Sequence, residues 1–410
     1  MLETVVVKFG GSVLEDEKAI SQVASLVKEK RGKGLGVVVV VSAMKGVTDQ
    51  IMSLSKKENP EIEPHLLDEL LSSGEKTSAR LVAAALASFG LHSVIVDPDT
   101  QYWPVITDDR HLDANPLVEE SRTKAQQLIM PLLVDGKVPV VCGFLGKTVG
   151  GKTTTLGRGG SDTTAVLLGN CLNANEVVLV KDVHGVYSSD PDKVTNPQFI
   201  ESLNGEEAEM LAAGGAKFLH VKALRYQSSG LRIRVTNLER LDSGTVIKGD
   251  LSPVQVEMVG EGVSMITCVG LNPQKTESII RAVRAVKEAR GDLLALSLEA
   301  NAAIFYVGGG ENVLDGVHRV LVEDKLGKAV SEFPRLSMIT VKGAALETER
   351  GVVQRITSPL ARASINVYGI VTILSSVRVF VSAEHKEKAF GLVREAMIGP
   401  AEDKARLSSR

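Results

Sequence analysis

The chain has 410 residues, which predicts about two to four domains. Its apolar content of 44%, charged content of 24% and net charge of −3 are typical of a globular protein and argue against nucleic-acid binding. The three cysteines, Cys142, Cys171 and Cys268, fit neither a disulfide framework nor a zinc knuckle. No stretch resembles a signal core or a membrane span, so we expect a cytoplasmic protein without membrane partners.

The first half of the chain alternates β-branched apolar runs with amphipathic stretches. Such runs are typical of strands buried in a parallel sheet, and the stretches between them have helical periodicity. We expect strand 4–9, helix 15–30, strand 36–41, helix 64–89, strand 93–96, helix 116–134, strand 138–144 and strand 176–180. The pattern predicts an α/β fold. Because ligands bind beyond the carboxyl ends of strands in such sheets, we expect these loops to share one site.

The second half of the chain has a different pattern. A helix at 206–213 and strands at 231–237 and 245–247 complete a first domain, which we place at 1–248, and a linker follows at 249–260. The remainder repeats one order of elements: strands 255–259 and 265–269, helix 275–289, strands 293–298 and 302–307, helix 313–322; then strand 337–341, helix 351–363, strands 366–370 and 377–382, helix 387–396. This predicts two small α+β modules, at 261–332 and 333–402, and such pairs commonly sense ligands or form dimers.

The glycine-rich stretch 156–165 is the strongest candidate for a ligand site. Its glycines allow backbone amides to approach a ligand, and Ser161 or Asp162 is placed to cap the helix that follows. A helix N-terminus binds anions, and Arg158 adds a bidentate donor for a carboxylate or phosphate. Taken alone, the stretch is equally consistent with an ordinary connection between a strand and a helix.

The preceding residues, 146–153, match the pattern of a phosphate-binding P-loop. A P-loop must lead directly into a helix. Here β-branched Thr153–Thr155 and more glycines follow, which make poor first turns of a helix. We therefore predict a hairpin at 146–155.

Other candidates are charged or polar residues elsewhere in the predicted first domain. Lys8 precedes Gly10 and Gly11, so a positive charge and bare amides are available to phosphoryl oxygens. Glu75, if it lies next to a substrate, can accept hydrogen bonds from an ammonium group. Residues 181–191 suit a nucleotide base and ribose, and Lys217 offers a second positive charge. No histidine has metal-ligand spacing to a partner, so we expect no resident metal site.

Together these motifs resemble the amino-acid kinase family and, within it, the aspartate kinases. The resemblance covers nearly all of 1–248, and its motifs occur in the family's order: 8–12, 39–44, 48–49, 73–75, 143–146, 156–165, 181–191 and 215–220. The stretch 156–165 is the most specific, because related kinases for acetylglutamate or uridylate differ there. The C-terminal modules resemble paired ACT domains, with 363–367 similar to the loop that binds amino-acid effectors.

The resemblance implies a mostly parallel sheet sandwiched by helices, followed by two ACT-like βαββαβ modules. It also implies transfer of the γ-phosphoryl group of Mg²⁺-bound ATP to the β-carboxylate of L-aspartate, the first step toward lysine, threonine and methionine. A carboxylate is ionised at pH 7, so the reaction needs positioning and charge neutralisation rather than a general base. Feedback by lysine or threonine and a homo-oligomer formed through the ACT modules follow from the same resemblance.

The resemblance also implies roles for individual residues. Lys8 and Lys217 would neutralise the phosphates, and Asp162 would hold the catalytic lysines. Arg158 would pair with the α-carboxylate of aspartate and Glu75 would bind near its amino group. The remaining positions are Thr48 and Ser42 for the substrate, Gly10, Gly11, Ser12, Lys181, Asp182 and Tyr187 for the nucleotide, and Val352, Ile365 and Asn366 for an effector.

Three positions depart from the family pattern. Ser12-Val13 stands where Thr-Ser is usual, and Asp192 and Lys76 each stand where an arginine is usual. The first departure keeps open a kinase of the same fold for another acidic amino acid or its derivative. A catalytically silent amino-acid sensor is the alternative from a different class, although the lysines, Arg158 and Asp162 argue against it.

Overall fold

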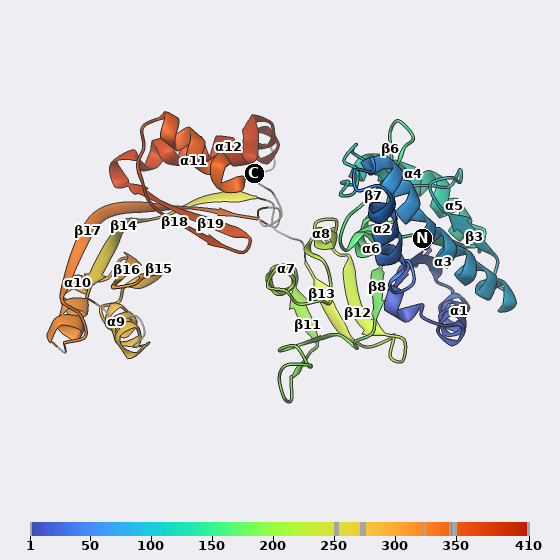
Figure 1. Ribbon diagram of the computed structural model, residues 1–410, viewed down its shortest axis with the longest axis horizontal. Coiled ribbons are helices and arrows are strands. Elements are labelled where there is room, and N and C mark those ends of the chain that lie inside the picture. The colour runs from blue at the N-terminus through green and yellow to red at the C-terminus, as the bar shows by residue number, and fades with distance from the viewer. Residues whose placement is uncertain are drawn as a thin grey trace. The chain divides into compact units, whose positions relative to one another are not determined.

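The computed structural model describes residues 2–249, 254–270, 276–323, 325–343, 346 and 351–407. The chain forms two compact units, Met1–Leu251 and Ser252–Arg410 (Figure 1). In the described part of the chain, no helix combines the length and the apolar character needed to cross a membrane.

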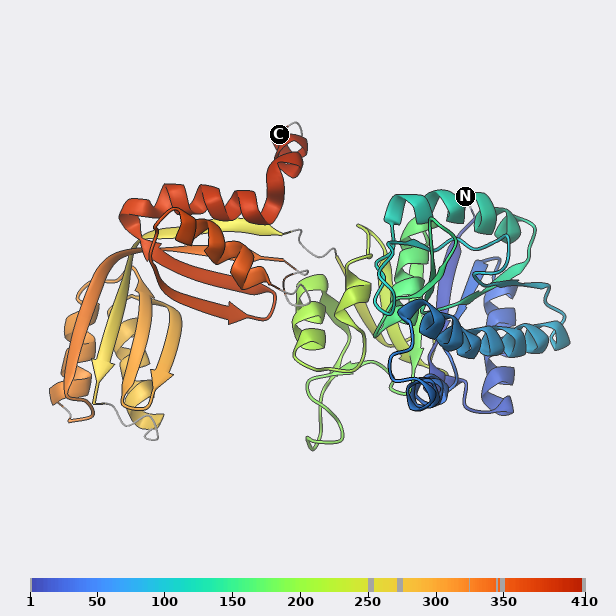
Figure 2. The same ribbon diagram turned by 45° about the horizontal axis from the view of Figure 1, so that its top comes forward.

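The first unit is built on an eight-stranded sheet in the order β11-β13-β12-β8-β1-β2-β5-β3. Only the β12–β13 pair is antiparallel among these described strands. The strands are β1 (Thr4–Phe9), β2 (Gly36–Val41), β3 (Ser93–Val96), β5 (Val138–Cys142), β8 (Glu176–Lys181), β11 (Ser202–Asn204), β12 (Arg232–Asn237) and β13 (Thr245–Lys248). β1 and β2 are buried along their whole length because helices cover both faces of the sheet (Figure 2). The predicted α/β fold is confirmed.

The helices of this unit follow the predicted order. They are α1 (Glu17–Gly32), α2 (Val47–Glu58), α3 (Pro64–Ser88), α4 (Val118–Lys124), α5 (Met130–Val134), α6 (Gly160–Cys171), α7 (Gly205–Ala213) and α8 (Val221–Leu224). The single helix predicted at 116–134 is divided by a π-helical turn at Ala125–Ile129. Pro131 explains the irregularity, since proline cannot donate to the preceding turn.

A smaller sheet holds the stretch that resembles a P-loop. β4 (Ile106–Thr107), β6 (Leu145–Thr148) and β7 (Thr153–Thr155) form it, and β6 pairs antiparallel with β7. The predicted hairpin is therefore confirmed. A separate two-stranded ribbon joins β9 (Val186–Tyr187) to β10 (Phe199–Ile200).

The second unit is one six-stranded antiparallel sheet in the order β15-β16-β14-β17-β19-β18. Its strands are β14 (Gln255–Val269), β15 (Asp292–Glu299), β16 (Ala302–Gly308), β17 (Ala329–Lys342), β18 (Val367–Ile373) and β19 (Ser376–Ser382). Its helices are α9 (Thr276–Glu288), α10 (Val313–His318), α11 (Val352–Arg362) and α12 (Lys386–Leu407). α9 and α10 cover one apolar core, and α11 and α12 cover another.

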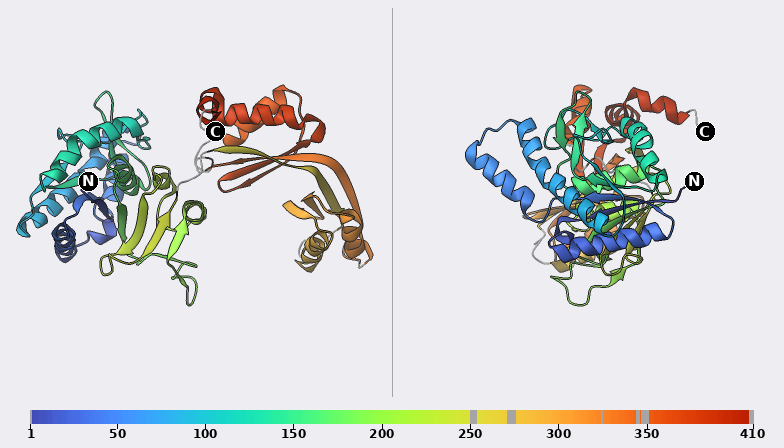
Figure 3. Two further views of the ribbon diagram at one scale, coloured as in Figure 1. Left: turned by 180° about the vertical axis from the view of Figure 1, so that it is seen from behind. Right: turned by 90° about the vertical axis from the view of Figure 1, so that its right-hand side faces the viewer.

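The two modules share one six-stranded sheet, which their sequences do not indicate. The strands expected at 255–259 and 265–269 are parts of the single strand β14, which pairs with β17 from Gln255 to Val269 (Figure 3). Val256 pairs with Val341, so the second module takes a strand from residues that precede the first. The linker expected at 249–260 is thus strand from Gln255 onward; its residues 250–253, and the helix start expected at Lys275, lie outside the described residues.

Candidate active site

Lys8 lies near the carboxyl end of β1, between the parallel strands β2 and β8. Its side chain is 5% exposed, which is unusual for lysine unless a partner is present. The backbone amide of Ser42 donates to the Phe9 carbonyl, and that of Gly10 donates to the Val180 carbonyl. The ends of three strands therefore converge at this lysine, where the fold predicts a ligand site.

The glycine-rich loop leads into α6 in a manner that differs from our expectation. Gly157 and Gly159 have φ values of +72° and +71°, and Gly159 is the N-cap residue. No side chain caps the helix; Ser161 and Asp162 both lie within its first turn. Because both glycines adopt the left-handed conformation, the helix begins at Gly160, before the residues that we expected to cap it. This leaves the carboxylate of Asp162 available to other partners.

Asp162 bridges two lysines. Its Oδ1 lies 2.7 Å from the Nζ of Lys8, and its Oδ2 accepts a hydrogen bond of 2.7 Å from the Nζ of Lys181 at the end of β8. Burial alone would raise the pKa of Asp162, but the charges and hydrogen bonds of the lysines outweigh it and hold that pKa well below its usual range. Burial lowers the pKa of Lys8 to about 8, against the attraction of Asp162. Two positive charges are thus fixed side by side.

Glu75 projects from α3 toward the same place. It is 2% exposed, and its Oε1 accepts a 3.0 Å hydrogen bond from the backbone amide of Ala43, while its buried Oε2 has no hydrogen-bond partner. Gly74 permits this approach, because a Cβ there would lie 2.7 Å from the Cβ of Ala43. Burial raises the pKa of Glu75 to about 7, with the Ala43 amide and Lys8 opposing the rise. An unpaired buried carboxylate oxygen is suited to a cationic ligand.

These side chains line one cavity of about 530 Å³. Seven of the residues singled out from the sequence lie in its wall: Lys8, Ser42, Thr48, Glu75, Arg158, Asp162 and Lys181. Arg158 is exposed, and Ser42 and Thr48 are half-buried. The cavity, whose wall also includes Asp49, therefore combines three cationic side chains with hydroxyl groups and three carboxylates, which suits a small ligand with both signs of charge.

Six other predicted positions lie outside the lining of this cavity. They are Gly10, Gly11, Ser12, Asp182, Tyr187 and Lys217. Tyr187 packs edge-on against Phe199 in the β9–β10 ribbon, with ring centroids 5.7 Å apart. Lys217 is exposed and interacts electrostatically with Asp190, on the same stretch that we assigned to the nucleotide. The structure thus pairs Asp162 with Lys8 and Lys181, and Lys217 lies elsewhere.

The remaining lining residues of the cavity were given no individual ligand-binding role. Gly157, Gly159, Gly160 and Ser161 belong to the predicted stretch 156–165, and Ala43, Asp49 and Phe144 belong to other motifs; the rest are Met52, Leu71, Leu112 and Thr155. Leu71 precedes Glu75 by one turn of α3, so helical periodicity identifies it. Leu112 lies in a loop between the motifs 73–75 and 143–146, about 30 residues or more from either, and its sequence carries no signal of this position.

The donor set of the site fits phosphate oxygens better than a resident metal. Across residues 2–407, outside the gaps in the description, no group of three or more His, Cys, Asp or Glu side chains could hold a metal ion. Lys8, Lys181 and the N-terminus of α6 are donors and positive charges, which bind anions. A divalent cation would therefore depend on phosphate oxygens for most of its ligands.

The expected effector residues lie in the second module. Val352, at the start of α11, and Ile365 are 5% exposed and pack in the apolar core of that module, whereas Asn366 is exposed. Two of the three side chains are therefore occupied by packing, and any contact of these two residues with a ligand would be through their backbone groups.

Comparisons with known proteins indicate the family of the chain. Residues 3–237 match the amino acid kinase family. The aspartokinase of Corynebacterium glutamicum is 30% identical, and the match covers 98% of this chain and 97% of the relative. The aspartokinase of Pseudomonas aeruginosa is also 30% identical, and the match covers 93% of this chain and 94% of the relative.

Solved structures show the same fold. Aspartate kinase from Synechocystis has a TM-score of 0.74 at 24% identity and matches 96% of this chain with 69% of its own. Escherichia coli aspartokinase III in complex with aspartate and ADP has a TM-score of 0.56 at 22% identity, over 97% and 100% of the two chains. The family match spans more than half of the chain and the relatives span nearly all of it, so this chain belongs to the amino acid kinase family and, within it, to the aspartokinases.

Proposed function

We propose that the chain transfers the γ-phosphoryl group of Mg²⁺-bound ATP to the β-carboxylate of L-aspartate, giving 4-phospho-L-aspartate and ADP. A carboxylate oxygen attacks the γ-phosphorus, and the bond from that phosphorus to the β–γ bridging oxygen breaks. The observation that carries the proposal is the single cavity in which Lys8 and Lys181, fixed by Asp162, lie with Glu75 and Arg158.

The acceptor end of the site suits an amino acid with two carboxylates. Arg158 would pair with the α-carboxylate, and the unpartnered Oε2 of Glu75 would accept a hydrogen bond from the ammonium group. Thr48 and Ser42 supply hydroxyl groups from the cavity wall. These contacts leave the β-carboxylate to face the lysines, so the acceptor is held in an orientation for attack.

The donor end would neutralise the charge that develops on the transferring group. Lys8 and Lys181 are held next to each other, so they need no reorganisation during the reaction. Asp162 is a positioning residue, because its two carboxylate oxygens lie 2.7 Å from the Nζ atoms of the two lysines and hold both in place. When bound, Mg²⁺ would further neutralise the phosphates.

The nucleotide would extend beyond the cavity. We propose that Gly10, whose amide donates to the Val180 carbonyl, lets the phosphates approach the backbone, where the Gly11 amide and the Ser12 hydroxyl contact them. Asp182 and Tyr187 would contact the ribose and base. Lys217 would meet the phosphates from the nucleotide side, in keeping with its interaction with Asp190. In this arrangement residues 1–248 form the catalytic domain.

We further propose that the ACT-like modules, at 261–332 and 333–402, regulate this reaction. One solved relative is E. coli aspartokinase III in complex with lysine and aspartate, in a T-state. Lysine, threonine or both would bind near Val352, Ile365 and Asn366 and inhibit the kinase, in a homo-oligomer that forms through these modules. Kinase activity measured against increasing lysine and threonine tests this inhibition. Activity that is unchanged by both amino acids would contradict it.

An acceptor assay tests the proposed reaction. ADP release from the whole chain is measured by a coupled assay with ATP, Mg²⁺ and one acceptor: L-aspartate, L-glutamate or N-acetyl-L-glutamate. We expect turnover with L-aspartate to exceed that with the other two. Preference for another acceptor would indicate a kinase of the same fold with a different substrate. No turnover with any acceptor would favour an amino-acid sensor.

A further inference from the structure

Two buried charged side chains have no part in the site described above. Asp68 on α3 is fully buried and Lys222 on α8 is 6% exposed. Both contact one loop, residues 108–115, from different helices. Buried charges destabilise a fold unless they are fully paired, so both side chains need partners in this loop.

Asp68 holds this loop from the side of α3. Its Oδ2 lies 2.7 Å from the Nδ1 of His111, and both of its carboxylate oxygens accept from the backbone amide of Leu112 at 3.2 Å. Its Oδ1 also accepts from the amide and hydroxyl of Thr155, at 3.1 and 2.6 Å. One carboxylate thus joins α3, the loop and β7.

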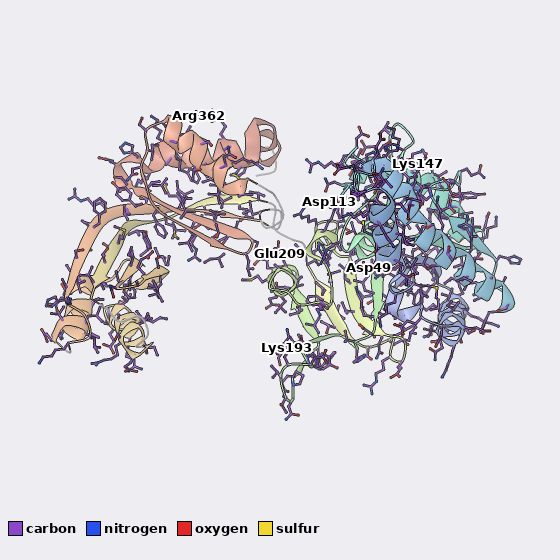
Figure 4. All side chains as sticks on the ribbon, viewed as in Figure 1. Asp49, Asp113, Lys147, Lys193, Glu209 and Arg362 are labelled. Atoms are coloured by element: carbon purple, nitrogen blue, oxygen red, sulfur yellow. The ribbon has the colours of Figure 1, made fainter. Side chains whose placement is uncertain are left out.

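Lys222 holds the loop from the side of α8. Its Nζ donates to Asp113 Oδ1 at 2.7 Å, to the Ala114 carbonyl at 3.0 Å and to the Leu156 carbonyl at 2.7 Å. All three N–H donors of the ammonium group are therefore used. Figure 4 labels Asp113, whose place next to α8 agrees with this ion pair. The loop is fixed to the start of the glycine-rich stretch.

Leu112 is the residue between these two anchors. Its neighbours, His111 and Asp113, each pair with a buried side chain, and its own φ of +68° is unfavourable for leucine. Such a conformation persists only where the surroundings impose it. Leu112 lines the cavity beside Gly157, where a Cβ would lie 2.5 Å from Asp113 Oδ1 and 3.3 Å from the Leu112 carbonyl oxygen.

We propose that the 108–115 loop is the wall of the acceptor site that limits the length of the amino acid, with Leu112 as the specificity-determining residue and Asp68 and Lys222 as positioning residues. The proposal rests on the proposed function, because it assumes that the acceptor occupies the cavity beside Arg158. A leucine fixed there excludes an acceptor one methylene longer by steric contact. A loop free to move would admit it.

The first test removes the wall itself. Leu112→Ala is compared with the wild type for kcat/KM with L-aspartate and with L-glutamate. We expect the ratio of glutamate to aspartate to rise by about tenfold or more, the discrimination that one methylene gives. Leu81→Ala, at an exposed leucine of α3, is the control and leaves the ratio unchanged. An unchanged ratio in Leu112→Ala overturns the proposal.

The second test loosens the anchors. Asp113→Asn alters a side chain that is 79% exposed, so the variant is expected to fold, and Lys222→Met removes its buried partner. Both should raise KM for aspartate about three- to tenfold, the value of one ordinary hydrogen bond because Asp113 is exposed to solvent, with KM for ATP unchanged. The double variant should be no worse than Lys222→Met. Arg110→Gln, in the same loop, is the control.

Two results overturn the positioning role. One is an unchanged KM for aspartate in Asp113→Asn; the other is a parallel change in both KM values with a lower Tm, which a purely structural role would cause. If the wild type has no turnover with either acid, the proposed function fails instead. Amide hydrogen exchange of the peptide around 108–115 then tests the positioning role separately. Faster exchange in Asp113→Asn than in the wild type supports this role, and equal exchange contradicts it.

Discussion

The two units of the molecule bury different kinds of side chain. In the described part of the chain, every buried lysine, aspartate and glutamate lies in the first unit: Lys8, Lys30, Asp68, Glu75, Asp97, Asp162, Glu209 and Lys222. The buried polar side chains described in the second unit are neutral, Ser278, Ser337 and Thr340. Burial of charge costs free energy that only pairing or function offsets. The difference therefore locates the chemistry in the first unit and leaves the second with apolar cores suited to packing.

Among the buried charges of the first unit, Lys8 should have the largest effect on activity when it is substituted. Lys8→Met should lower kcat/KM for ATP by about 10²- to 10³-fold, because one preorganised charge is lost from the transferring phosphoryl group. In the wild type, kcat/KM for ATP should fall as pH rises through about 8, where Lys8 loses its proton. Steady-state kinetics between pH 6.5 and 9.5 measure both effects. A flat profile through pH 8 would contradict the role of Lys8.

Substitution of Glu75 should have the next largest effect. Glu75→Gln should raise KM for aspartate about 10- to 100-fold, the value of a charged hydrogen bond, with a smaller change in kcat. Because the pKa of Glu75 is about 7, KM in the wild type should rise as pH falls below 7 and the carboxylate is protonated. A KM that is independent of pH between 6 and 8 would argue against contact with the ammonium group.

The same variant has an opposite effect on stability. The pKa of Glu75 is higher in the folded chain than in the unfolded chain, so its ionisation destabilises the fold once pH exceeds the unfolded value, and fully above about 7. Glu75→Gln should therefore raise Tm at pH 8 and change it little at pH 4. Thermal denaturation at both values measures the difference, and a lower Tm at pH 8 would show that the ionised carboxylate stabilises the fold.

A smaller effect, on the stability of the fold, is expected from a substitution where α3 meets the end of β2. Gly74→Val should destabilise the chain by about 1–3 kcal/mol, because its side chain would overlap Ala43 and displace Glu75. Gly32→Ala is the control, because a Cβ there meets no atom within 4 Å; it should be neutral or slightly stabilising. Urea denaturation compares the two. Equal stabilities would show that α3 can move without cost.

The smallest effect is expected in the hairpin that resembles a P-loop. Lys152 is exposed in the turn between β6 and β7 and lies outside the cavity. Lys152→Ala should change kcat/KM for ATP by less than about twofold, as expected for a surface substitution. A loss comparable to that of Lys8→Met would restore the P-loop interpretation.

Much of the fold could be predicted because its signals are local. The apolar runs at β1, β2 and β8 and the β-branched residues of β7 identify these strands without tertiary information. The continuity of β14 could not be predicted, because it depends on pairing with β17 on both sides of an irregularity between Val259 and Val263. The π-helical turn before Pro131 likewise depends on how one helix accommodates a proline.

The site was predictable where its residues fall in recognisable motifs, as at Lys8, Glu75 and Asp162. The second lysine partner of Asp162 was not, because only the structure shows that Lys181, rather than Lys217, is within 2.7 Å of it. Asp68 and Lys222 carry no sequence signal at all. Their partners lie 43 to 109 residues away along the chain, and only the packing of α3, α8 and β7 brings them together.

The central claim is that Asp162 fixes two lysines for phosphoryl transfer to aspartate. The most direct measurement incubates the wild type and Asp162→Asn with ATP, Mg²⁺ and L-aspartate and traps the acyl phosphate with hydroxylamine. The account predicts aspartyl hydroxamate from the wild type and at least about 10²-fold less from Asp162→Asn, with both folded. No hydroxamate from the wild type, or equal amounts from the two proteins, would contradict it.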